Sequence, residues 1–93
     1  FRQTALLETL KQKDIKTLVL AGMMTHMCID ATTRAAFDLG FECILAHDAC
    51  ATRALKFQGD IVPAKQVHYA FLAALQSTYA KVLSVEEILS DAL

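Results

Sequence analysis

Hydrophobic and polar positions alternate along the chain in a way that predicts helices and strands in turn. Leucines at helical spacing between positions 6 and 10 predict a first helix, with Thr4 as its N-cap residue. The apolar run 17–21, which ends at Gly22, is typical of a parallel strand that is covered on both faces. An alanine-rich segment over 27–39 predicts the next helix, and Gly40 is placed to end it.

The second part of the chain continues this alternation. Strands are expected at 41–46 and 81–83, with a long helix between them over 63–79. The stretch 52–62 has a mixed character and is predicted to be a loop. The segment Ser84-Val85-Glu86-Glu87 has the Ser-x-x-Glu spacing of a capping box and predicts the start of a last helix.

Strands that alternate with helices predict an α/β fold with a parallel sheet and right-handed crossovers. The expected architecture is three-layered, α/β/α, because strands of this kind need helices on both faces. The few strands predicted here make a narrow sheet with an open edge. The pattern therefore indicates that the chain supplies about half of a larger sheet.

Composition limits the classes of partner. A chain of 93 residues is long enough for one small domain, and 55% hydrophobic residues is high for that size. We therefore expect part of its surface to be covered by another segment or subunit, as in a homo-oligomer. A net charge of -1 with no basic cluster excludes the usual patterns of nucleic-acid and acidic-membrane binding. No apolar run is long enough to span a bilayer.

The cysteines indicate a reducing compartment. The chain has three of them, Cys28, Cys43 and Cys50, which is an odd number without CxxC spacing. This pattern argues against a disulfide framework and against a zinc ribbon. The cytoplasm is the expected location.

The most informative residues follow the first predicted strand. In open α/β sheets, ligands bind beyond the carboxyl ends of the strands. Gly22 permits a sharp turn there, and Thr25 is a suitable N-cap residue for the following helix. Cys28 then falls in the first helical turn, where free N–H groups favour a thiolate and an oxyanion beside it. The pattern predicts a nucleophilic cysteine.

Gly22-x-x-Thr25-x-x-Cys28, with the residues that follow it to Ala36, resembles the active-site signature of the isochorismatase-like cysteine hydrolases. That family includes nicotinamidases and carbamoyl-sarcosine amidases. Asp48-Ala49 and Val67-His68 also match family positions. The resemblance spans residues 1–93, but only the C-terminal half of a family domain.

The resemblance implies a mechanism for a small amide substrate. A Cys-Asp-Lys triad attacks the carbonyl, expels ammonia or an amine, and then hydrolyses the thioester. Cys28 corresponds to the nucleophile, and the N–H groups of Met24 and Cys28 correspond to the oxyanion hole. A non-proline cis peptide is implied at Met23-Met24, and Thr25 and His26 are implied at the wall of the substrate pocket.

The same resemblance places the Asp and Lys of the triad in the N-terminal half of the family domain. No residue of this chain is assigned to either role, and no metal ligand or cofactor is assigned. This departure supports an alternative, a non-catalytic interaction or scaffold module of the same fold. A redox sensor based on Cys28 is a third class, although neither Cys43 nor Cys50 is a local resolving partner in the sequence.

For the remaining candidates, structural roles compete with functional ones. His26 is balanced between lining the pocket and lying in a solvated loop. Packing is favoured for His68, and a structural role for His47. Asp48 is expected to accept backbone N–H bonds. A core position is expected for Cys43, and a loop position without function for Cys50.

Overall fold

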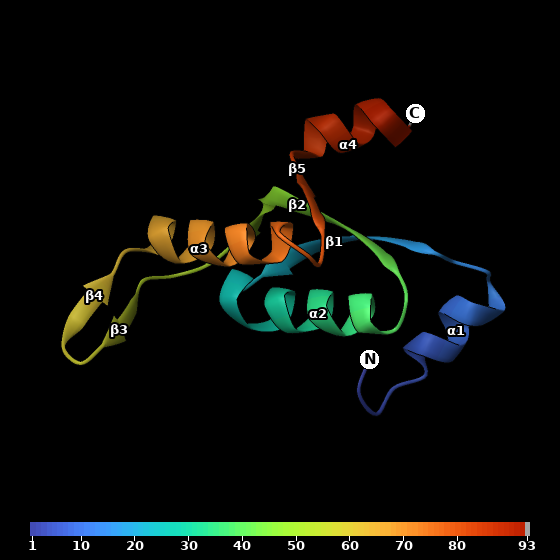
Figure 1. Ribbon diagram of the computed structural model, residues 1–93, viewed down its shortest axis with the longest axis horizontal. Coiled ribbons are helices and arrows are strands. Elements are labelled where there is room, and N and C mark those ends of the chain that lie inside the picture. Colours follow the sequence, from blue (N-terminus) through green and yellow to red (C-terminus); the bar gives the residue numbers. More distant parts are fainter. Residues whose placement is uncertain (93) are drawn as a thin grey trace.

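A three-stranded parallel sheet forms the centre of the fold (Figure 1). The computed structural model describes residues 1–92. The strands are β1 (Thr17–Met23), β2 (Glu42–Ala51) and β5 (Lys81–Leu83), in the spatial order β1-β2-β5. Both pairings are parallel, so the carboxyl ends of all three strands lie at the same edge of the sheet.

Helices lie on both faces of this sheet, which confirms the predicted three-layer α/β arrangement (Figure 1). Residues Leu20 and Leu45 of the sheet pack against Leu72 and Leu75 in the main core cluster, on the face that α2 and α3 cover. On the opposite face, Ile88 of α4 lines a groove with sheet residues. The helices are α1 (Leu6–Gln12), α2 (Asp30–Asp38), α3 (Ala64–Gln76) and α4 (Val85–Ala92).

Strand β1 is buried on one face only. Leu20 is 9% exposed and packs in the core, whereas its neighbour Val19 is 56% exposed. The prediction that the run 17–21 is covered on both faces is therefore wrong for the described residues. A strand with one bare apolar face retains the surface that a further layer of protein would cover.

Strand β2 is longer than the predicted strand 41–46, because its far end pairs with β1 again. Leu20 lies opposite Leu45, but Gly22 lies opposite Cys50, so the register changes between these pairs. The segment that was expected to leave the sheet at His47 therefore remains in it. Cys50 is a strand residue and not the loop residue expected from the sequence.

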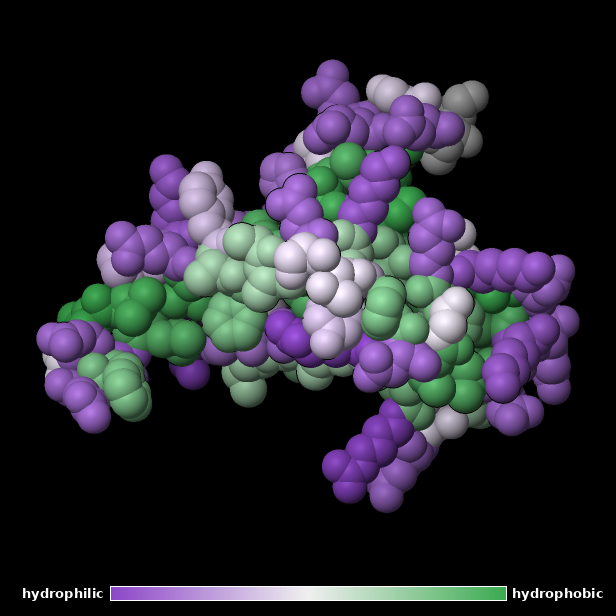
Figure 2. All heavy atoms as spheres, in the orientation of Figure 1, coloured by the Kyte–Doolittle hydropathy of each residue, from purple (hydrophilic) through white to green (hydrophobic). Residues whose placement is uncertain are grey.

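The predicted loop 52–62 contains a two-stranded antiparallel hairpin, β3 (Leu55–Phe57) and β4 (Asp60–Val62). Gln58 and Gly59 connect the strands with positive φ angles of 52° and 85°. Positive φ at both central residues is typical of the tight turns that join hairpins. The hairpin leaves Phe57 72% exposed, and Figure 2 shows hydrophobic atoms over this end of the molecule.

The end of α2 lies where the sequence predicts it, whereas the end of α3 and the start of α1 differ from the prediction. Gly40 ends α2 as predicted, with backbone bonds from Gly40 to Phe37 and from Phe41 to Ala36, both 3.0 Å long. Helix α3 ends at Gln76, earlier than expected. Helix α1 uses Ala5 as its N-cap, and the neighbouring Thr4 hydroxyl donates to the Phe1 carbonyl at 2.8 Å and accepts the Leu6 N–H at 3.4 Å.

The predicted capping box at the start of α4 is confirmed. The Ser84 N–H donates to Oε1 of Glu87 at 3.0 Å, and the Glu87 N–H donates to the Ser84 hydroxyl at 3.1 Å. Asp48 in β2 accepts the Val85 N–H at 2.8 Å, which is the structural role expected for it. These bonds attach α4 to the carboxyl end of the sheet. None of the helices in residues 1–92 has both the length and the hydrophobicity needed to cross a bilayer.

The capping box makes a testable contribution to acid stability. Hydrogen bonds from Ser84, first from its backbone N–H and then from its side chain, hold the pKa of Glu87 below its ordinary value of 4.5. A carboxylate with a lowered folded pKa stabilises the fold above its unfolded pKa, and that stabilisation is lost as the pH falls through the folded pKa. Glu87→Gln keeps an acceptor for the Ser84 N–H but cannot titrate. Urea unfolding of the full-length protein should show wild type with a larger free energy of unfolding than the variant at about pH 6. That difference should shrink as the pH falls to about 3. A difference that does not change with pH would contradict this contribution.

Candidate active site

The site begins where β1 leaves the sheet. Gly22 has a φ of +133°, which side chains rarely adopt, and it lies at the register change opposite Cys50. A Cβ added there would meet only Ile29 Cδ1 at 3.5 Å, so conformation rather than space demands glycine. The chain stays paired with β2 for one more residue, with Met23 opposite Ala51, and then enters the next segment.

Cys28 lies in a five-residue π-helical turn, η1 (Thr25–Ile29), that connects β1 to α2. The Met24 carbonyl accepts N–H bonds from Met27 at 3.0 Å and from Ile29 at 3.3 Å, the residues on either side of Cys28. The predicted helix 27–39 is therefore a π turn followed by α2. Single π turns of this kind are frequent at functional sites.

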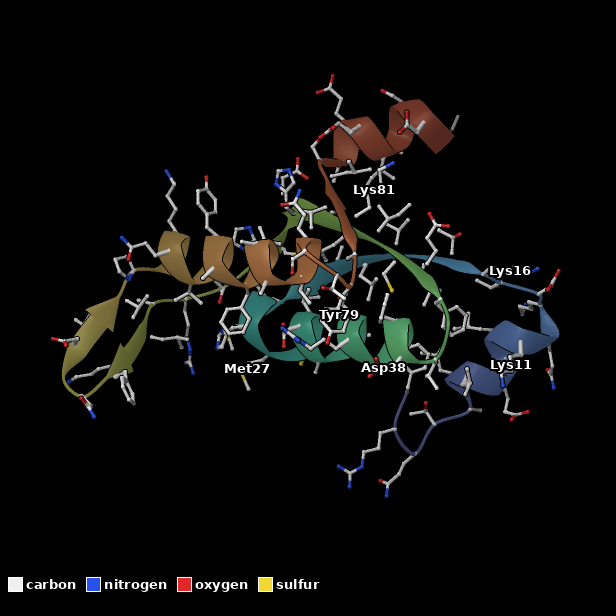
Figure 3. The ribbon with its side chains drawn as sticks, in the orientation of Figure 1. Lys11, Lys16, Met27, Asp38, Tyr79 and Lys81 are labelled. Atoms are coloured by element: carbon white, nitrogen blue, oxygen red, sulfur yellow. The ribbon has the colours of Figure 1, made fainter. Side chains whose placement is uncertain are left out.

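The Cys28 side chain is exposed at the carboxyl edge of the sheet. Met23 and Met27, close to it in the sequence, are 66% and 50% exposed, so this segment presents apolar side chains to solvent. Figure 3 shows Met27 in the turn that precedes α2, with its side chain pointing away from the ribbon. The peptide bond between Met23 and Met24 is cis, at the position that the resemblance implies.

Thr25 has a different role from the two expected for it. Its side chain is fully buried, so it does not present its hydroxyl to a pocket surface. The N-cap of η1 is Met24, and no side chain makes a capping bond there. The Thr25 hydroxyl lies 2.8 Å from Nδ1 of His68 in α3 and 3.4 Å from the Ala51 carbonyl in β2. These two contacts connect η1 to α3 and to β2.

His26 and His68 are both held by hydrogen bonds. Nδ1 of His26 lies 2.7 Å from the hydroxyl of Thr52, and its ring meets the Phe71 ring edge-on at 6.0 Å between centroids. His26, itself a residue of η1, is thus anchored and half-buried. His68 also contacts the His47 carbonyl at 3.1 Å through Nε2, which confirms the satisfied packing position expected for it.

The other two thiols differ from Cys28 in their surroundings. Cys43 is 3% exposed in the core, as predicted, and burial raises the pKa of its thiol. Cys50 is half-buried, its Sγ donates to the Ala46 carbonyl at 3.3 Å, and burial raises the pKa of its thiol as well. Both environments favour the neutral and unreactive thiol. Of the three cysteines, only Cys28 is exposed to solvent.

Within residues 1–92, no three side chains of His, Cys, Asp or Glu converge as a metal site would require. The rings of His26 and His68 instead contact Thr52, Phe71, Thr25 and the His47 backbone carbonyl.

A family model for the isochorismatase domain matches residues 1–87. The chain belongs to the isochorismatase family. It is 49% identical over 89 residues to the uncharacterised isochorismatase family protein YddQ of Bacillus subtilis, covering 96% of this chain and 49% of that protein.

Solved structures of the family superpose closely on the chain. An isochorismatase-family hydrolase from Oleispira antarctica is 58% identical, with a TM-score of 0.92 over 97% of this chain and 48% of that one. The nicotinamidase of Bacillus subtilis is 26% identical, with a TM-score of 0.73 over 90% of this chain and 41% of that one. The isochorismatase-like chain thus spans about half the length of the relatives that it matches.

Gly22 provides a test of how the turn is held. Gly22→Ala forces a side chain into a positive-φ conformation, so we expect it to destabilise the full-length protein by about 1–3 kcal/mol. Urea unfolding measures this loss. Ala21→Ser is the matched control, because Ala21 is an exposed neighbour in the same strand and should change stability little. Equal stability of the two variants would show that the turn does not depend on glycine.

Proposed function

We propose that the full-length protein is a cysteine hydrolase that cleaves a small amide or a related C–N bond, with Cys28 as its nucleophile. The observation that carries this proposal is the exposed Cys28 thiol, held in a π turn at the carboxyl end of β1. The two remaining cysteines are buried or half-buried as neutral thiols. Membership of a hydrolase family and the position of the site within the sheet support the same assignment.

In the proposed reaction, the Cys28 thiolate attacks the carbonyl carbon of the substrate, and the carbonyl oxygen becomes an oxyanion. The N–H groups of Met24 and Cys28 donate hydrogen bonds to that oxyanion. The intermediate collapses to a thioester and releases ammonia or an amine, which takes up a proton. Water then hydrolyses the thioester, releases the carboxylic acid and regenerates the thiol.

Two groups in this scheme must come from outside the chain. An Asp takes the thiol proton and returns it to the leaving amine, and a Lys completes the triad. We assign neither role to a residue of the chain. The half-length match to its relatives supports their location in the remaining part of the protein.

The substrate class follows from the surroundings of Cys28. Met23 and Met27 offer adaptable apolar contacts, and the half-buried His26 offers a polar one beside them. A small apolar amide would fit such a wall. The structural similarity to a nicotinamidase supports amide cleavage, because that relative is named for hydrolysis of an amide.

The proposal extends to the state of the protein in the cell. All three cysteines are free, and a nucleophilic thiol survives best where the surroundings are reducing, so we place the enzyme in the cytoplasm. The bare face of β1 with Val19 supports coverage by further protein, from the same polypeptide or from another subunit of a homo-oligomer.

Replacement of the nucleophile tests this function. In the full-length protein, Cys28→Ala should lower kcat/KM for every amide that wild type hydrolyses by about a thousandfold or more, because no thioester can form. Steady-state hydrolysis of a panel of small amides provides the measurement.

The matched control is Cys50→Ala, which removes the half-buried thiol opposite Gly22 and should leave kcat/KM within about threefold of wild type. Unchanged hydrolysis by Cys28→Ala would show that Cys28 is not the nucleophile. An equal loss in both variants would trace the effect to the fold rather than to the chemistry.

A further inference from the structure

His68 connects the turn that carries Cys28 to two other elements of the fold. Its ring lies on α3, and its two nitrogens reach Thr25 of η1 at 2.8 Å and the His47 carbonyl of β2 at 3.1 Å. Since Thr25 is fully buried, its hydroxyl has no access to water as an alternative partner. The imidazole therefore bridges the nucleophile turn, a helix and the central strand.

The partners determine which nitrogen carries the proton. A carbonyl oxygen can only accept a hydrogen bond, so Nε2 of His68 must donate to His47. In the neutral ring Nδ1 is then an acceptor, and the Thr25 hydroxyl donates to it. That hydroxyl has a single proton, and the 2.8 Å contact to Nδ1 is shorter than the 3.4 Å contact to the Ala51 carbonyl. The chain Thr25 to His68 to His47 thus has one consistent direction.

This chain of bonds restrains the backbone beside Cys28. Thr25 directly follows Met24, whose carbonyl accepts the N–H groups of Met27 and Ile29 on either side of Cys28. A rotation of Thr25 would move that carbonyl and therefore the whole π turn. Buried polar bonds of this kind are costly to break, because each partner is left without a replacement.

We propose that His68 is a positioning residue for the nucleophile: as the Nε2–H tautomer it holds the Thr25 hydroxyl and so fixes the turn that carries Cys28. The inference rests on the proposed function of Cys28. His68 touches neither substrate nor sulfur in this scheme and acts only through Thr25.

Asn and Gln variants of His68 separate its two bonds. The amide of Asn takes the place of Nδ1 and can accept from Thr25, whereas the amide of Gln takes the place of Nε2 and can donate to His47. His68→Phe keeps the ring but neither bond. In the full-length protein, His68→Phe should lower kcat about a hundredfold with KM changed less than about threefold, because the turn is misplaced. His68→Asn should recover to within about tenfold of wild type, and His68→Gln should remain near His68→Phe.

A double-mutant cycle tests whether His68 acts through Thr25. Thr25→Val removes the hydroxyl and should lower kcat as much as His68→Phe, while the double variant should lose no more than either single variant. Thr25→Ser is the control, because it keeps the hydroxyl that bonds to His68 and should lower kcat much less than Thr25→Val. Urea unfolding corrects each rate for the folded fraction. If His68→Phe does not fold, the kcat values of His68→Asn and His68→Gln still test whether the bond to Thr25 is the one that matters.

Two readouts do not depend on hydrolysis and keep this inference separate from the proposed function. Nitrogen-15 NMR should show His68 as the Nε2–H tautomer. Alkylation of Cys28 by iodoacetamide should be slowed by the same factor in His68→Phe and Thr25→Val, and not further in the double variant. If Cys28→Ala leaves hydrolysis intact, the proposed function fails, and the alkylation rates still decide the role of His68. An Nδ1–H tautomer, equal rescue by Gln and Asn, or alkylation rates equal to wild type would each overturn the positioning role.

Discussion

The parallel pairing of β1 with β2, and the change of register at Gly22, is the constraint on which the site depends. Before the change Leu20 lies opposite Leu45, and after it Gly22 lies opposite Cys50. The irregularity places a glycine at a φ of +133° one residue before the end of β1, just ahead of the π turn that carries Cys28. It also brings the far end of β2 alongside that turn. There the Ala51 carbonyl contacts the Thr25 hydroxyl, and the Thr52 hydroxyl contacts His26.

Much of the fold could be predicted because it is encoded locally. Apolar runs, Gly40 and the Ser84 capping box act within a few residues, and they gave the order of elements and the parallel sheet. The failures involve contacts distant in sequence. The extension of β2 to Ala51 depends on pairing with β1, which no local pattern of β2 reveals. The hairpin 55–62 is closed by Gln58-Gly59, a weaker turn signal than Asn-Gly or Asp-Gly, although the short apolar stretches on either side were a usable indication.

The candidate site was predictable where it is a local motif. Gly22 and Cys28 lie within one strand–turn–helix segment, and the structure places the thiol at the exposed end of that segment. The role of Thr25 was not predictable, because its partner His68 is distant in the sequence and the choice between a cap and a buried bond depends on that partner. A buried threonine and a helix histidine each have ordinary packing explanations, so only their mutual distance reveals the connection.

The central claim is that Cys28 forms a covalent intermediate, and peptide mass mapping after rapid acid quench tests it most directly. The native full-length protein would be mixed with an amide that it hydrolyses and quenched before the first turnover is complete. The account predicts an acyl group of the substrate, bound as a thioester, on the peptide that contains Cys28. Cys50→Ala should show the same adduct. An acyl group on another residue, or rapid hydrolysis with no adduct at any quench time, would contradict the account.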